Sequence, residues 1–75
     1  MTPYKNLGGN SGIDLYEIGA DSITIRFKDG WFYLYTAQSA GSGNVEEMKA
    51  LAETGHGLNS FIKRRVNKLF ARKWK

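Results

Sequence analysis

The segment from Ser22 to Thr36 constrains the fold most, because it has the pattern of two strands joined by a tight turn. In Ser22–Lys28, isoleucine and phenylalanine alternate with polar or charged residues, which is typical of a half-buried strand. Asp29-Gly30 follows, and glycine readily adopts the positive φ that hairpin turns require. Trp31–Thr36 is rich in aromatic residues, which favour strands. The sequence therefore predicts an antiparallel β-hairpin.

The register of this hairpin decides which side chains reach the core, and the sequence leaves two registers open. With a two-residue turn at Asp29-Gly30, Phe32 and Leu34 would join the core. The opposite face would then interleave aromatic and basic side chains, a composition that suits stacking on nucleic-acid bases. Those side chains are Arg26, Lys28, Trp31, Tyr33 and Tyr35.

The second register has a three-residue turn with a bulge at Lys28-Asp29-Gly30. Shifting a strand by one residue turns all its side chains to the opposite face of the sheet. Tyr33 and Tyr35 would then face the core, and Phe32 and Leu34 would point outward. Of the two roles for the tyrosines, we favour packing in the core or across strands over base stacking.

One further strand and two helices complete the predicted fold. Ile13–Ile18 is predicted to be a strand before the hairpin. A helix is expected to begin at Asn44, whose side chain can cap it, and to end at Gly55. A last helix is expected to place the apolar residues of Leu58–Phe70 on one face, with Trp74 off that stripe. We predict an α+β fold, a three-stranded antiparallel meander followed by two helices (βββαα).

The length of 75 residues is enough for one small domain. Met1–Gly12, rich in glycine and asparagine, is predicted to be a flexible leader, and residues 13–75 to be the domain. The leader lacks the apolar stretch of a secretory signal, and no stretch approaches the roughly 18 apolar residues that span a bilayer. The chain has no cysteine, which excludes disulfides and thiolate metal sites and fits a cytoplasmic location.

Charge is distributed unevenly along the chain. Leu58–Lys75 has seven basic residues and no acidic one, a charge of +7, whereas the rest of the chain has −3 and the total is +4. A basic helix on a mildly acidic body indicates a polyanion partner. On that helix one basic row is expected, with Lys63 and Arg65 beside it. The members of the row are Arg64, Lys68, Arg72 and Lys75.

The basic row has two interpretations. It could contact phosphates, which gives affinity without reading the base sequence. It could instead be a solvated helix face that nearby carboxylates partly neutralise, as charge runs often are. The carboxylates available for this are Asp14, Glu17, Asp21 and Glu53.

Three short motifs, in order and spacing, carry a family resemblance. They are Ile23-x-Ile25-x-Phe27 followed by Gly30, then Tyr33-Leu34-Tyr35, and finally Gly55-x-x-Leu58-Asn59-x-x-Ile62-Lys63. With these motifs, residues 13–66 resemble the KTSC domain, which occurs at the C-terminus of some lysyl-tRNA synthetases and as a stand-alone bacterial protein. The function of this family is not established. Its synthetase context implies RNA binding only by association.

The chain also departs from the family pattern. Ala37-Gln38 stands where the family usually has Val-Pro, and Leu58 stands where an aromatic residue usually precedes the asparagine. The basic residues after Val66 lie beyond the resemblance, so any role they have would be an addition by this chain to a shared scaffold.

Catalytic and metal-binding patterns are missing from the sequence. His56 could serve as a general base, but no nucleophile motif such as G-x-S-x-G accompanies it. The glycines form neither a P-loop nor a dinucleotide-binding fingerprint. One histidine without cysteine offers little to a metal ion. We therefore predict a protein that is not an enzyme and that uses no metal or cofactor.

The predicted function is a small nucleic-acid-binding module, with RNA favoured over duplex DNA. The residues predicted to bind are Lys63, Arg64, Lys68, Arg72, Lys75, Arg26, Lys28, Tyr33 and Tyr35. The alternative is a protein-interaction or self-association module that uses residues 31–35, as in a homodimer. Membrane binding by the basic helix is disfavoured, because a domain this small needs the apolar stripe of that helix for its core.

Overall fold

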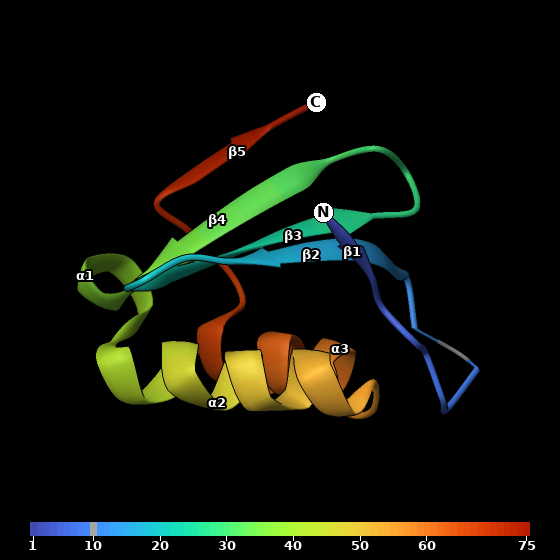
Figure 1. The fold of residues 1–75 in the computed structure, drawn as a ribbon. Helices are drawn as coiled ribbons and strands as arrows, with labels where there is room; N and C mark the ends of the chain where they lie inside the picture. The colour runs from blue at the N-terminus through green and yellow to red at the C-terminus, as the bar shows by residue number, and fades with distance from the viewer. Residues whose placement is uncertain (10) are drawn as a thin grey trace.

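The computed structural model describes residues 1–9 and 11–75, and within them five antiparallel strands form one sheet (Figure 1). The strands lie in the sheet in chain order, each beside the next. They are β1 (Thr2–Pro3), β2 (Ile13–Ile18), β3 (Ser22–Phe27), β4 (Phe32–Thr36) and β5 (Arg72–Trp74). The α+β class is therefore confirmed, and β2, β3 and β4 form the expected meander. The βββαα layout is matched only in part, because two more strands flank this meander.

The helices lie between β4 and β5 in the chain. They are α1 (Ala37–Ala40), α2 (Ser42–Thr54), α3 (Leu58–Phe61) and the π-helix η1 (Ile62–Val66), into which α3 runs directly. Both α2 and α3 lie beneath the same face of the sheet, and no helix of the described residues covers the other face (Figure 1). The core fills the layer between sheet and helices. Its fully buried side chains include Ile23, Ile25, Met48, Leu58 and Val66.

The β3–β4 hairpin adopts the second of the two predicted registers. Ile25 pairs with Tyr33, and Ile23 pairs with Tyr35. The Gly30 amide donates to the Phe27 carbonyl at 2.9 Å, and Gly30 has a φ of 94°, which closes a three-residue turn. The two tyrosines therefore face the helices, and packing in the core, the role we favoured for them, is confirmed.

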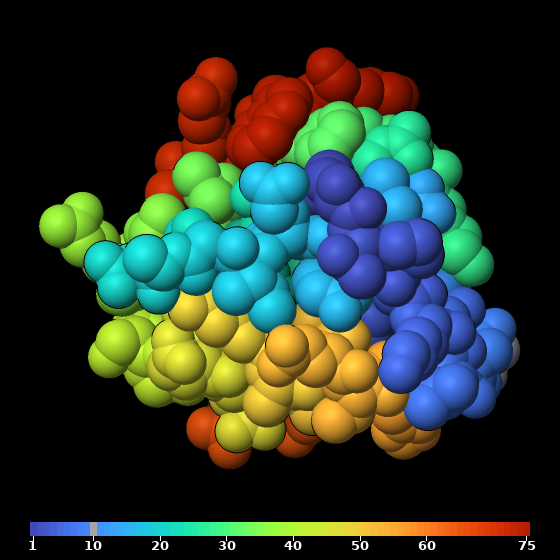
Figure 2. Space-filling view, in the orientation of Figure 1, coloured from blue at the N-terminus to red at the C-terminus, as the bar shows by residue number. Residues whose placement is uncertain are grey.

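The first residues of the predicted leader are part of the fold. Thr2 and Pro3 pair with β2, and the buried side chain of Tyr4 joins the core. The Tyr4 hydroxyl accepts a hydrogen bond from the Leu58 amide at 3.3 Å, which ties this segment to the start of α3. In the space-filling view, the N-terminal residues (dark blue) lie against the orange helix (Figure 2). The glycine-rich composition of this segment gave no indication that Tyr4 is a core residue.

The predicted helix at Asn44 begins two residues earlier, and a short helix precedes it. Thr36 and Ser39 form a capping box at the start of α1, for which the sequence predicted no helix. Asn44 is not a cap, because its side-chain amide donates to the Ala40 carbonyl at 2.8 Å. The end of α2 is as predicted: Gly55 has a φ of 80°, and its amide donates to the Leu51 carbonyl.

The prediction of one long last helix is wrong. The helix ends at Val66, and Asn67, with a φ of 31° and a ψ of −100°, turns the chain back toward the sheet. Two gains explain the reversal. Phe70 reaches the rings of Tyr33 and Tyr35, with centroid distances of 5.2 Å and 6.4 Å. Strand β5 also pairs with the edge of β4, whose backbone groups would otherwise lack partners in the sheet.

Candidate nucleic-acid interface

The predicted basic row does not exist, because its members lie on different elements. Arg64 is on η1, Lys68 follows it in the turn, and Arg72 is on β5 with Lys75 just beyond. The seven basic residues instead form two groups. The helix group is Lys63, Arg64, Arg65 and Lys68. The strand group is Arg72, Lys73 and Lys75.

Neither group is neutralised by carboxylates. In the part of the chain that the structure describes, the ion pairs are Arg26 with Asp14 and Lys49 with Glu46. All seven side chains of the two groups belong to exposed residues and form no ion pair there. Of the carboxylates considered as neutralising partners, Asp14 binds Arg26 instead. The positive charge of both groups is therefore available to an external anion.

A ladder of aromatic and basic side chains crosses the uncovered face of the sheet. Strand pairing aligns Arg26 with Phe32 and Phe32 with Trp74, on the side opposite the inward-facing Tyr33. The Phe32 and Trp74 rings are stacked, with centroids 5.3 Å apart and planes at 2°. The Arg26 guanidinium lies 5.6 Å from the Phe32 centroid, and that of Arg72 lies 5.3 Å from the Trp74 centroid. We call Arg26, Phe32, Trp74 and Arg72 the aromatic ladder.

The rest of the strand group lies against aromatic rings on the other side of β5. The Lys73 ammonium is 4.8 Å from the Trp31 centroid and 5.3 Å from that of Tyr33. The Lys75 ammonium is 5.6 Å from the Trp31 centroid. Strand β5 thus carries cations to both sides of the sheet edge, each next to an aromatic ring.

The two tyrosines predicted to bind differ in exposure. Tyr35 is 1% exposed, and its hydroxyl donates to the Asn67 carbonyl at 2.9 Å, so its ring offers no face to a base. Tyr33 is half-buried and packs edge-on against Phe27 and Phe70, each 5.2 Å away. Sequence reasoning missed Trp74, Phe32 and Lys73 as candidates. The one signal was that Trp74 did not fit the apolar stripe of a helix.

The pKa of Tyr35 is raised to about 12, mainly because the side chain is buried and also because of electrostatic repulsion from Tyr33. The unfolded chain loses that proton near its ordinary value of about 10. The contribution of Tyr35 to stability is therefore complete below pH 10 and is lost as the pH rises through 12. We expect urea-unfolding free energies to fall between pH 10 and 11 by up to about 1.4 kcal/mol more in the wild type than in Tyr35→Phe. Equal slopes for the two proteins would contradict this account.

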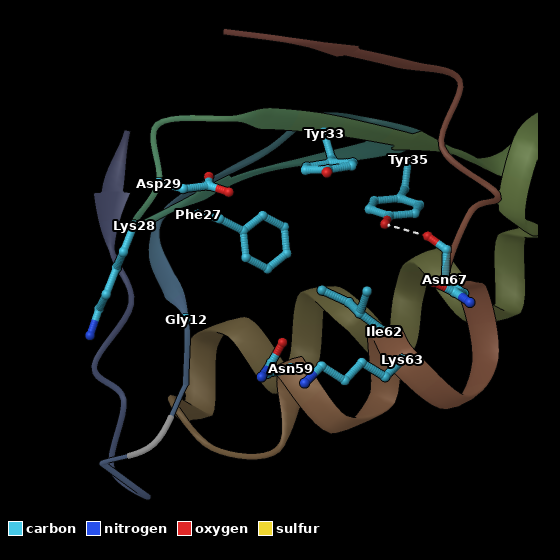
Figure 3. A pocket seen from close by; sticks show the side chains of 10 residues that line it. All are labelled: Gly12, Phe27, Lys28, Asp29, Tyr33, Tyr35, Asn59, Ile62, Lys63 and Asn67. Carbon is cyan, nitrogen blue, oxygen red and sulfur yellow. Dashed lines mark hydrogen bonds between the residues drawn. The ribbon is translucent and has the colours of Figure 1, made fainter.

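A cleft with a volume of about 390 Å³ lies between the hairpin and the α3–η1 segment (Figure 3). Phe27, Tyr33 and Ile62 provide apolar walls, and Asn59 and Lys63 bring polar groups from the helix side. Lys28 also lines the cleft, but its side chain extends away from the aromatic walls (Figure 3). The cleft therefore combines ring surfaces with a small number of polar groups, as small-molecule sites do.

His56 lies in a different place from both basic groups. It is exposed and lines a separate cavity of about 150 Å³ with Tyr4 and Ser60. Among residues 1–9 and 11–75, no cluster of three histidine, cysteine or acidic side chains could hold a metal ion. The helices of those residues are too short and too polar to cross a membrane.

Comparison with known proteins found no matching family model, no matching curated protein and no matching solved structure. The resemblance to the KTSC domain therefore stays a prediction, and any function has to be argued from the geometry of the chain itself.

Proposed function

We propose that this protein binds single-stranded nucleic acid, with RNA as the preferred ligand. The observation that carries the proposal concerns the strand group, whose three cations form no ion pair with another described residue. Arg72 of this group lies over the stacked rings of Phe32 and Trp74, on a sheet face that no described helix covers, and the two lysines lie at the same strand. Phosphate groups need such cations, and unpaired bases need exposed ring surfaces. A duplex keeps its bases stacked inside, so a ring on a flat sheet favours single strands.

Trp74 is the ring on which a base would stack. The Trp74 ring is stacked with Phe32, and the exposed guanidinium of Arg72 lies over it, 5.3 Å from its centroid. An incoming base would take the place of Arg72 on the Trp74 ring, and Arg72 would turn to the adjacent phosphate. Arg26 is less suited to such a movement, because Asp14 holds it in an ion pair. Lys73 and Lys75 would contact the following phosphates along the sheet edge.

Fluorescence anisotropy with a labelled single-stranded RNA of mixed sequence tests the proposal. We expect Trp74→Leu to weaken binding about 5- to 100-fold, because stacking of one base is worth about 1–3 kcal/mol. Leucine keeps apolar cover over Phe32, and thermal unfolding of the variant checks that β5 is retained. The comparison variant is Trp31→Leu, which changes the other tryptophan; Trp31 lies beside Lys73 and Lys75, away from the Phe32 and Trp74 stack where the base is proposed to bind. Equal losses for both variants, or no binding by the wild type at low salt, would overturn the proposal.

Self-association is a second candidate, because the same uncovered face carries apolar side chains. Leu15, Phe32 and Leu34 are only half-buried there, and β4 itself is enclosed between β3 and β5. A second copy would therefore cover the face of the sheet and would not extend β4. Light scattering across a concentration series distinguishes the two candidates. A dimer that dissociates when RNA is added would indicate that RNA and a second copy of the chain bind to the same face. A dimer that does not bind RNA would favour self-association.

A further inference from the structure

The cleft beneath the hairpin has features that the aromatic ladder does not explain. It lies on the helix side of the sheet, whereas the ladder lies on the uncovered side. Its volume of about 390 Å³ is within the range of pockets for small organic ligands, about 300–1,000 Å³. Two rings that meet edge-on at 86°, those of Phe27 and Tyr33, give it aromatic walls. A flat, aromatic ligand fits such walls better than a flexible aliphatic one.

The cleft has polar groups on both of its sides. Asn59 points into the cleft from α3, and Asp29 points toward it from the tip of the hairpin (Figure 3). The side-chain amide of Asn59 makes no hydrogen bond to another described residue, so its donor and acceptor are both available. One Asp29 oxygen accepts from the Trp31 amide at 2.9 Å, which orients the carboxylate and leaves its other oxygen as an acceptor.

A cation lies beside these groups. The Lys63 side chain extends along the floor of the cleft (Figure 3). It forms no ion pair with an acidic residue in the part of the chain that the structure describes. Asp29 would repel an anion at the hairpin tip, so a phosphate would bind at the Lys63 end. The cleft thus has an anion-binding end, aromatic walls and an end that accepts hydrogen bonds.

Unusual backbone also borders the cleft. Ile62 and Lys63 belong to a π-helix, a form that is frequent at functional sites. Asn67, which also lines the cleft, has a positive φ of 31°, and its carbonyl accepts a hydrogen bond from the buried Tyr35 hydroxyl. Such backbone costs free energy and persists where the surrounding structure holds it in place. Here it sets the position of the helix wall relative to the hairpin.

We propose that the cleft takes one nucleotide of the bound strand, with the phosphate on Lys63 and an amino-bearing base between the aromatic walls. This inference rests on the proposed function, since it assigns a second contact to the same ligand. In this arrangement the Asp29 oxygen accepts from the exocyclic amino group, and the Asn59 amide, on the other side of the cleft, hydrogen-bonds another polar atom of the nucleotide. Lys73 and Lys75 lie against Trp31, between the ladder and the hairpin tip, where the strand would cross the sheet edge.

An NMR titration with AMP, UMP and inorganic phosphate tests the assignment. We expect AMP to shift the amide signals of Asn59, Lys63 and Asn67, with UMP giving weaker binding by at least about threefold. Shifts of the same size with inorganic phosphate would show that only charge is sensed and would overturn the proposal. Binding of UMP equal to that of AMP would overturn the amino-group recognition assigned to Asp29.

Paired variants separate the cleft from general electrostatics. Lys63→Gln and Arg65→Gln remove the same charge from the same helix, but only Lys63 lines the cleft. We expect Lys63→Gln and Asn59→Ala to weaken AMP binding about tenfold, and Arg65→Gln less than twofold. The dispersion of the NMR spectrum confirms that each variant is folded. Equal effects of the two charge variants would contradict a site in the cleft.

RNA binding measured in parallel distinguishes the two proposals. If the RNA binds with normal affinity to Asn59→Ala and Lys63→Gln, the cleft inference fails while the function stands. If no single-stranded RNA binds to the wild type, the proposed function fails and this inference fails with it. If AMP enters the cleft and the RNA does not bind, the cleft is a site for free nucleotides, and the assignment to a bound strand is wrong.

Discussion

Changing Arg72, Lys73 and Lys75 together to glutamate is expected to abolish binding of single-stranded RNA. The strand group supplies about three phosphate contacts in the proposed complex, and the reversal replaces each of them with repulsion. At 50 mM salt we expect at least a roughly 100-fold loss of affinity in the anisotropy assay. For the wild type, three neutralised phosphates predict a slope of about −2 for log affinity against log salt, and for the variant a slope near zero or of opposite sign.

The helix group provides a control with the same change in net charge. Changing Arg64, Arg65 and Lys68 to glutamate also replaces three positive charges with negative ones, so it lowers the net charge of +4 by the same amount. These residues lie on elements away from the ladder. We expect a loss of about tenfold or less, from the weaker general attraction, and a salt slope still near −2. Equal losses for both triple variants would show that the RNA senses only the total charge, and a defined site on β5 would be excluded.

Only part of the candidate site could be predicted from the sequence. A count of charges was enough to predict that residues 58–75 favour a polyanion. It was not enough to place those charges, because the row of Arg64, Lys68, Arg72 and Lys75 required helical geometry that ends at Val66. The ladder depends on a pairing between Phe32 and Trp74, which are far apart in the chain. Asn59 was noticed only as part of a motif, since its cleft forms between two distant segments.

For the fold, local patterns predicted local structure well. The alternation in β3, the turn glycine and the end of α2 at Gly55 all follow from rules that act within a few residues. The failure lies at Phe70, whose spacing from Val66 continues the helical period. In the structure the chain reverses after Val66, and Phe70 then packs against Tyr33 and Tyr35. Hydrophobic periodicity cannot distinguish a continuing helix from such a reversal, because Phe70 packs on the core in both. The reversal is favoured because it pairs the otherwise unpaired edge of β4.

Removing residues 67–75 is therefore expected to destabilise the whole domain and not merely to remove charge. The truncation exposes the edge of β4, uncovers Phe32 and removes the Asn67 carbonyl that accepts a hydrogen bond from the buried Tyr35 hydroxyl. Loss of the half-buried Phe70 side chain costs about 2–4 kcal/mol and an unsatisfied buried hydroxyl about 1–3 kcal/mol. Since a domain of this size has only about 4–11 kcal/mol of stability, we expect urea unfolding at a much lower midpoint or no cooperative transition.

A milder pair of variants decides the case if the truncated chain does not fold. Phe70→Ala should lower the unfolding free energy by about 2–4 kcal/mol, because Phe70 packs against both tyrosine rings. Its neighbour Leu69 is 47% exposed, so Leu69→Ala should cost less than about 1 kcal/mol. If Phe70→Ala were as mild as Leu69→Ala, the C-terminal segment would not be part of the core. The strand group would then lie on a mobile tail, and a fixed ladder could not be the surface on which a base stacks.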